Sequence, residues 1–218
     1  MSMTWQNGRQ LAGIGKTGLT TSYQYDDSGM RIKKTVNGVV TDYYLNGSSI
    51  LAEVTGGTQT DYYYDESGNL FGFKKGGAEY YYIRNGQNDI IGILDSSGNQ
   101  VVSYVYDTWG KLISILSKDA DGNFTVDRTN DMTFIGYQNP FRYRGYYYDA
   151  EMGLFYVGSR YYDPETGRFV NADGMVSTGQ GMLSYNMFAY CENNPVNRLD
   201  PYGFSWEDAK SYWQSSAG

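Results

Sequence analysis

The sequence predicts an all-β protein: antiparallel β-hairpins repeated along a single-layer, shell-like curved sheet, followed by a less regular C-terminal core segment. Three observations support this fold class. Tyr occurs 24 times and Gly 28 times among 218 residues, and Tyr favours strands whereas Gly is a poor helix former. A Tyr-Asp-x-x-Gly pattern recurs along the chain. Pairs of Asn and Gly, the strongest two-residue hairpin signal, lie between the copies of that pattern.

The repeated pattern has the physical properties of a hairpin turn. Strand-favouring residues such as 61–64 precede it, the Asp side chain accepts backbone N–H bonds just downstream, and Gly supplies a positive φ. Copies begin at Tyr25, Tyr64 and Tyr106, spaced by 39 and 42 residues, and a degenerate copy begins at Leu94. Longer copies occupy residues 148–153 and 162–167. Each copy therefore predicts one β-hairpin.

Asn-Gly pairs at 7–8, 37–38, 46–47 and 85–86 predict further hairpins between these copies. Up to about residue 135 the chain is expected to be a meander of short antiparallel strands with almost no helix. About three to five repeats would build only an arc of a shell. We therefore expect an open sheet whose exposed edges allow self-association.

Near residues 118–136 the periodic hairpin motifs give way to denser, less regular sequence, and all four prolines follow residue 139. We divide the chain into a repeat region (1–136), a core segment (137–204) and a short tail (205–218). Residues 117–127 are polar, and Asp119, Asp121 and Asp127 give them a faint calcium-loop spacing. The flanking helices and terminal Glu of an EF-hand are missing, which favours a surface loop. In the tail, Ser205 is a candidate N-cap for a helix over 205–213.

The composition excludes several classes of function. The chain has no His, so it has no Ser-His-Asp triad and no His-ligated zinc. Its one cysteine, Cys191, excludes an internal disulfide and is expected to be a buried apolar residue. A net charge of −7 argues against a nucleic-acid partner. No apolar run approaches the ~20 residues of a membrane helix, and the start has no signal-peptide pattern. We expect no metal and no cofactor.

An ordered series of motifs carries a resemblance to a known family. Residues 141–149 read Phe-Arg-Tyr-Arg-Gly-Tyr-Tyr-Tyr-Asp, and residues 160–169 read Arg-Tyr-Tyr-Asp-Pro-Glu-Thr-Gly-Arg-Phe. Asn-Ala-Asp-Gly (171–174), Asn-Asn-Pro-Val-Asn (193–197) and Asp-Pro-Tyr-Gly (200–203) follow in order. Together with the repeats, this series resembles the Rhs/YD-repeat family. Residues 137–204 are similar to its Rhs repeat-associated core.

The resemblance implies a function. In this family a strip of repeats coils into a hollow shell, the core segment closes its end, and a C-terminal toxin payload is enclosed. Many members cut themselves at the end of the core in an aspartate-dependent reaction. A secretion or delivery apparatus, or release from the cell surface, then presents the toxin. The resemblance therefore implies a secreted or cell-surface protein and no membrane insertion.

Paired carboxylates can do this chemistry without His, Cys or metal, because one acts as base on water and the other as acid. The resemblance places Asp173 and Asp200 as the candidate pair, with Glu192 as an alternative partner. It places the cut after Phe204. This sequence has Asp173-Gly174 where the family has Asp-Pro, and Phe204 where it has Leu. The alternative from the residues alone is that these aspartates are turn residues.

Tyr triplets at 62–64, 80–82 and 146–148 place aromatic rings on both faces of the strands. We interpret them as a shell wall whose rings pack sideways and whose hydroxyls stay hydrated. The alternative is a cell-surface adhesion or carbohydrate-binding module without catalysis. Lysines such as Lys33 and Lys34 are expected to be solvated strand or turn positions.

Overall fold

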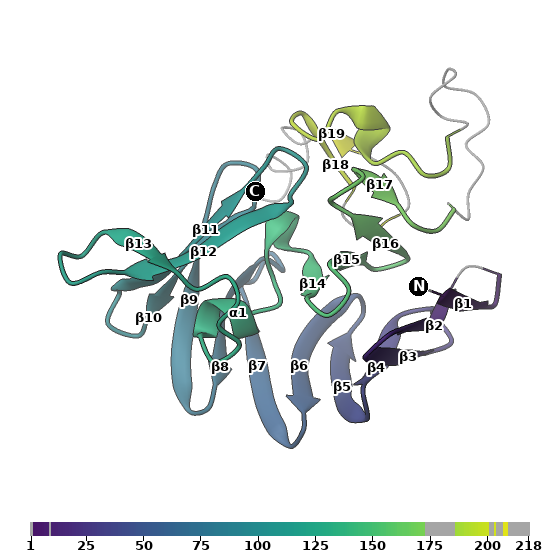
Figure 1. Cartoon of the computed structure of the whole chain (residues 1–218), viewed down its shortest axis with the longest axis horizontal. Coiled ribbons are helices and arrows are strands. Elements are labelled where there is room, and N and C mark those ends of the chain that lie inside the picture. Colours follow the sequence, from purple (N-terminus) through teal and green to yellow (C-terminus); the bar gives the residue numbers. More distant parts are fainter. Residues whose placement is uncertain (1, 9, 173–185, 201–202, 204–206, 209–218) are drawn as a thin grey trace.

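The computed structural model describes residues 2–8, 10–172, 186–200, 203 and 207–208. Its main feature is an open, antiparallel 13-stranded sheet in which every strand pairs with its neighbours in sequence (Figure 1). The meander predicted from the hairpin signals is therefore confirmed. The strands are β1 (Ser2–Gln6), β2 (Gln10–Lys16), β3 (Leu19–Tyr25), β4 (Arg31–Val36), β5 (Val39–Asn46), β6 (Ser49–Thr55), β7 (Thr58–Tyr64), β8 (Leu70–Lys75), β9 (Ala78–Arg84), β10 (Ile90–Asp95), β11 (Gln100–Tyr106), β12 (Leu112–Lys118) and β13 (Phe124–Asp127).

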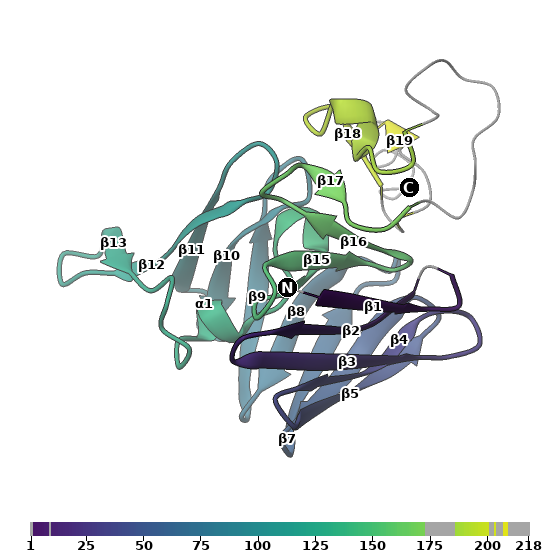
Figure 2. The ribbon, with the colours of Figure 1, turned by 45° about the vertical axis from the view of Figure 1, so that its right-hand side comes forward.

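The following part of the chain is less regular and packs on the concave face of the sheet. The sheet bends so that β1–β4 and β8–β11 lie on opposite sides of β15 (Figures 1 and 2). In the residues that the structure describes, this part consists of a small second sheet, a two-stranded pair, one short helix and two 3₁₀ turns. The elements are α1 (Ile135–Gln138), η1 (Tyr143–Gly145), β14 (Tyr147–Asp149), β15 (Leu154–Val157), β16 (Arg160–Asp163), β17 (Arg168–Phe169), η3 (Cys191–Asn193), β18 (Arg198–Leu199) and β19 (Glu207–Asp208).

Six turns share one hydrogen-bond pattern. In the turn that begins at Asp26, the N–H of Gly29 donates to the Asp26 carbonyl, and Asp26 Oδ1 accepts the N–H groups two and four residues downstream. The Tyr-Asp-x-x-Gly pattern and its degenerate copy predicted four of these turns, and the Asn-Gly pair at 85–86 predicted the hairpin between β9 and β10. The other two begin at Asn85 and Asp119. Asn85 takes the place of the Asp, and Asn88, at φ 66°, takes the place of the Gly.

The tyrosines that precede Asp26, Asp65 and Asp107 each make the same structural hydrogen bond. A bulge near the start of a strand leaves ladder groups unpaired, and the Tyr hydroxyl from the following strand supplies the missing donor. Tyr64 Oη donates to the Ile50 carbonyl oxygen at 2.9 Å, and Tyr25 and Tyr106 make the same bond to Leu11 and Ile90. Arg84 occupies this position before Asn85, and its Nη2 donates to the Leu70 carbonyl oxygen. Between Tyr64 and Tyr106 the structural repeat is therefore about half as long as the sequence pattern indicates.

Two local predictions are wrong. Residues 117–127 are not a surface loop, because β12 and β13 pair across the turn at 119–122. Two of the three carboxylates in the supposed calcium loop support turns instead: Asp119 and Asp127 each accept an N–H bond and a threonine hydroxyl bond. The helix expected from Ser205 is contradicted at residues 207–208, which pair as β19 with β18.

The concave face of the sheet and the core segment share one hydrophobic core, with Ile90, Ile93 and Phe73 at 1% exposure or less. Inward tyrosines contribute to it: Tyr23, Tyr43 and Tyr62 are all nearly inaccessible. The expectation that tyrosine hydroxyls stay hydrated is therefore wrong for this face. It holds for outward rings such as Tyr44, which is 57% exposed.

A buried ionic cluster joins the first repeats to the core segment. Asp149, at the end of β14, accepts bonds from Arg31 Nη1 at 2.5 Å and Arg31 Nη2 at 3.2 Å, and from Lys34 Nζ at 2.7 Å. Lys34 also pairs with Glu151 at 2.9 Å. Both Arg31 and Asp149 are fully buried, and the guanidinium lies 4.4 Å from the ring centre of Tyr156. The prediction that Lys34 is solvated is wrong, because its partners come from more than 100 residues away.

Candidate functional site

The candidate site is the place where Asp200 and Gly203 sit on the hairpin formed by β15 and β16. Asp200 is 2% exposed, and its Oδ2 accepts a bond from Arg160 Nη2 at 2.7 Å. Its Oδ1 accepts the backbone N–H of Gly203 at 2.8 Å, and its carbonyl oxygen accepts a bond from Tyr146 Oη. The carboxylate therefore fixes both the hairpin and the segment that follows.

Gly203 occupies a slot that only glycine fits. Its φ is +75°, a conformation that L side chains rarely adopt. A Cβ here would collide with the Val157 carbonyl oxygen and would lie 2.9 Å from Ser159 Oγ. Ser159 Oγ donates a 2.6 Å hydrogen bond to the Gly203 carbonyl oxygen. The backbone at Gly203 is thus held on both sides. We call the residues that hold it, Val157, Ser159, Arg160 and Asp200, the seat of Gly203.

Glu192 lies in η3, and its carboxylate pairs with Arg198. Three successive residues, Cys191, Glu192 and Asn193, have φ between 49° and 61°, so the chain makes a left-handed turn here. Such a turn is strained for L residues. Because Asp200 pairs with Arg160, the two carboxylates have separate cationic partners.

The other two predicted site positions, Asp173 and Phe204, lie outside the described residues. Asp163, at the end of β16, is a turn residue that accepts the Glu165 N–H and the Thr166 hydroxyl. Sequence reasoning missed Ser159 and Arg160 as parts of the seat. The Gly158-Ser159 dipeptide between β15 and β16 is a two-residue hairpin signal that could have placed them.

Cys191 is buried with a free thiol, as predicted. Burial raises the pKa of the thiol to about 12, so the group is not a nucleophile near neutral pH. Over residues 2–8, 10–172, 186–200, 203 and 207–208, no group of three or more Cys, Asp or Glu side chains could hold a metal ion. Within the same part of the chain, no helix is long and apolar enough to span a membrane.

Comparisons with known proteins place the chain in a family. Residues 7–196 match the model of the Teneurin YD-shell family. The tRNA3(Ser)-specific nuclease WapA of Bacillus spizizenii is 37% identical over 207 residues, which is 92% of this chain and 8% of that protein. The double-stranded DNA deaminase toxin A of Burkholderia cenocepacia is 31% identical over 125 residues, covering 57% of this chain and 8% of that protein.

A solved structure shares the fold. The crystal structure of TcdB2-TccC3-Cdc42 covers 93% of this chain and 10% of its own, with a TM-score of 0.68 at 20% identity. The present chain therefore spans a small part of each of these proteins. The family match covers both the repeats and most of the core segment. The chain belongs to the Teneurin YD-shell family, as its resemblance to Rhs/YD-repeat proteins implies.

Proposed function

We propose that this chain is the last arc of a YD shell, which encloses a C-terminal payload and releases it by self-cleavage after Phe204. Asp173 and Asp200 form the proposed catalytic pair, with Glu192 as the alternative partner. One carboxylate takes a proton from water, which attacks the Phe204 carbonyl carbon. The other gives a proton to the Ser205 nitrogen as the C–N bond breaks.

The observation that carries this proposal is the seat of Gly203. Gly203, which precedes Phe204 in the chain, is held by the Ser159 hydroxyl and by a slot with no room for a Cβ. A backbone fixed at Gly203 limits the positions that the peptide bond after Phe204, one residue further on, can take relative to the protein, and such a restriction favours an intramolecular cleavage. Asp200, three residues upstream of Gly203, is held in place by Arg160.

The names of the relatives support the proposal that the shell encloses a payload. One is named a tRNA nuclease and another a DNA deaminase toxin, and this chain matches only 8% of each. We infer that the chain supplies the shell and that a toxic activity belongs to a segment beyond it. The partners are then the payload and a secretion or delivery apparatus, and the protein acts when secreted or at the cell surface.

Intact-mass measurement tests the cleavage. The chain is produced with a folded domain fused after Gly218 and incubated at neutral pH, because Asp-Pro bonds are acid-labile. We expect two products from the parent and one uncut chain from Asp173→Asn. Asp200→Asn and Glu192→Gln identify the partner, and Asp163→Asn is the matched control, since this aspartate only supports a turn. An uncut parent chain, or a cut that survives Asp173→Asn, contradicts the proposal.

One observation favours a second function, a carbohydrate-binding outer face. The Phe71 and Tyr81 rings on β8 and β9 are parallel within 8° at 6.4 Å, and Tyr63 lies 6.0 Å from Phe71. Glu79 accepts hydrogen bonds from Tyr63 and Tyr81, so an acceptor for sugar hydroxyls lies beside the rings. Binding to immobilised glycans that Phe71→Ala abolishes supports this function. No binding at millimolar glycan contradicts it.

The two edge strands of the large sheet provide surfaces for self-association. Among the residues that the structure describes, strands β1 and β13 each pair on one side only, so both present unpaired backbone groups. We propose that copies of this chain associate through these edges when no further repeats extend the sheet. Size-exclusion chromatography at rising protein concentration tests this. A monomer at every concentration contradicts it.

A further inference from the structure

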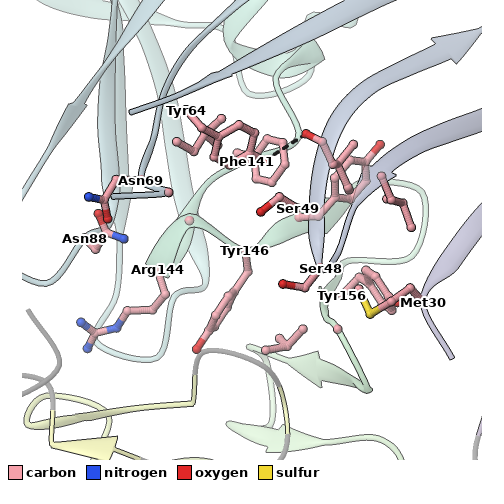
Figure 3. Close-up of a pocket in the computed structure, with 18 of the residues that line it drawn as sticks. Met30, Ser48, Ser49, Tyr64, Asn69, Asn88, Phe141, Arg144, Tyr146 and Tyr156 are labelled. Atoms are coloured by element: carbon pink, nitrogen blue, oxygen red, sulfur yellow. Dashed lines mark hydrogen bonds between the residues drawn. The ribbon is translucent and has the colours of Figure 1, made fainter. Parts of the chain in front are cut away.

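A pocket of about 220 Å³ lies where the turn ends of β5–β10 meet the core segment (Figure 3). Three arginines, Arg31, Arg84 and Arg144, belong to its lining, and none of the described residues that line it is Asp or Glu. The whole chain has a net charge of −7. The pocket therefore has the opposite charge balance to the protein around it.

The three arginines differ in how their charges are compensated. Arg31 pairs with Asp149, and Arg144 lies 3.7 Å from an Asp89 oxygen. Arg84 has no acidic partner within 4.0 Å among the described residues. Burial in this environment lowers the pKa of its guanidinium. Arg84 is thus a partly buried cation with no ion pair among the described residues, an arrangement that a bound anion would stabilise.

The repeat itself does not require an arginine at this position. At the equivalent positions Tyr25, Tyr64 and Tyr106, a neutral hydroxyl bonds the bulge carbonyl. Arg84 makes that bond to Leu70 with Nη2, and it donates to Asn88 Oδ1 with Nη1. A guanidinium has five N–H donors. The three that remain find no acceptor in the described part of the chain.

Other polar groups converge on the same space. Figure 3 shows the hydroxyls of Ser48 and Ser49 pointing across the pocket towards Asn69 and Asn88. No described residue forms a hydrogen bond with either serine hydroxyl or with Asn88 Nδ2. Apolar side chains make up much of the remaining wall, which weakens solvent screening of the arginine charge. They include Leu45, Ile50, Leu70 and Phe141.

We propose that this pocket is a binding site for a small oxyanion, a phosphate or carboxylate group, with Arg84 as the cation that recognises it. A guanidinium binds either group through two parallel N–H bonds. The serine hydroxyls and the Asn88 amide supply further donors. The site is independent of the proposed self-cleavage, because it shares none of Asp173, Asp200 and Phe204.

The test uses the whole chain with inorganic phosphate in one arm and acetate in the other, against sodium chloride of equal ionic strength. Saturable heat in a calorimetric titration is expected in at least one arm. The arm with the tighter binding identifies the group. At ten times Kd, the parent Tm should rise by about 3–6 °C. No saturable heat in either arm at tens of millimolar overturns the proposal.

Arg84→Tyr is the decisive variant, because it restores the residue that the repeat uses and keeps a donor for the Leu70 carbonyl. It should fold, with a Tm in chloride at least equal to that of the parent, and its anion-dependent Tm rise should be lost. Lys74→Tyr removes the same charge from an exposed strand position and should keep the full rise. An equal rise in the parent and in Arg84→Tyr overturns the assignment to this pocket.

Discussion

Replacing Asp149 by Asn should weaken the attachment of the core segment to the first repeats. The loss of stability should exceed that caused by removing a carboxylate at the surface. The substitution keeps the shape of the side chain but removes the anion shared by Arg31 and Lys34. Three charge-assisted hydrogen bonds end on this carboxylate, at 2.5, 3.2 and 2.7 Å. Both cations would then remain buried without full compensation.

Breaking a buried ion pair by removing one partner costs about 3–5 kcal/mol. We expect Asp149→Asn to lower the free energy of unfolding by this amount, which corresponds to about 6–20 °C in Tm. Urea unfolding followed by circular dichroism measures it. The matched control is Asp42→Asn, whose partner Lys33 lies 3.0 Å away, with both side chains about 40% exposed. The control should cost less than about 1 kcal/mol. Equal losses for the two variants would refute the reasoning.

The same carboxylate predicts a pH dependence. Burial alone would raise the pKa of Asp149, but the charges of Arg31 and Lys34 outweigh it and hold the pKa below the usual range. A carboxyl whose pKa is lower in the folded protein stabilises it fully above the unfolded pKa of about 3.9. That stability is lost as the pH falls through the folded value. The parent should therefore lose more stability than Asp149→Asn on acidification below about pH 4.

Three further predictions concern other sites. Gly203→Ala should destabilise the seat, because a Cβ collides with backbone there, and should slow the release of a fused domain on intact-mass time courses; an unchanged rate would contradict the seat. The Cys191 thiol, with its pKa raised to about 12, should react with iodoacetamide only after unfolding, and rapid native labelling would count against its burial. Tyr64→Phe leaves the Ile50 carbonyl without its donor and should cost about 1–3 kcal/mol in urea unfolding. Tyr44→Phe, at an exposed ring, should cost nothing measurable.

The repeat region could be predicted well because its signals are local. In the turn at 26–29, the Asp and the Gly lie within four residues of each other. The hydrogen bonds that they make also join residues only a few positions apart in the sequence. At residues 84–88 the Tyr-Asp-x-x-Gly pattern is absent, and only the Asn-Gly pair at 85–86 predicted the hairpin that β9 and β10 form. Arg84 and Asn85 carry out the tasks of Tyr and Asp, and neither residue matches the pattern.

The contacts between the sheet and the core segment could not be predicted in this way. Lys34 is next to Lys33, whose side chain is 37% exposed. Its own position is buried because Asp149 and Glu151, which pair with it, come from a distant part of the chain. The seat of Gly203 likewise depends on the distant Ser159. The motif series marked Asp200 as a candidate residue, but its Arg160 partner was visible only in three dimensions.

The most direct test of the account is the identity of the new N-terminus after incubation of the chain with a fused C-terminal domain at neutral pH. The account predicts a C-terminal fragment that begins at Ser205, formed by the parent and absent from Asp173→Asn. A fragment that begins elsewhere, or one that forms equally in both proteins, would contradict it.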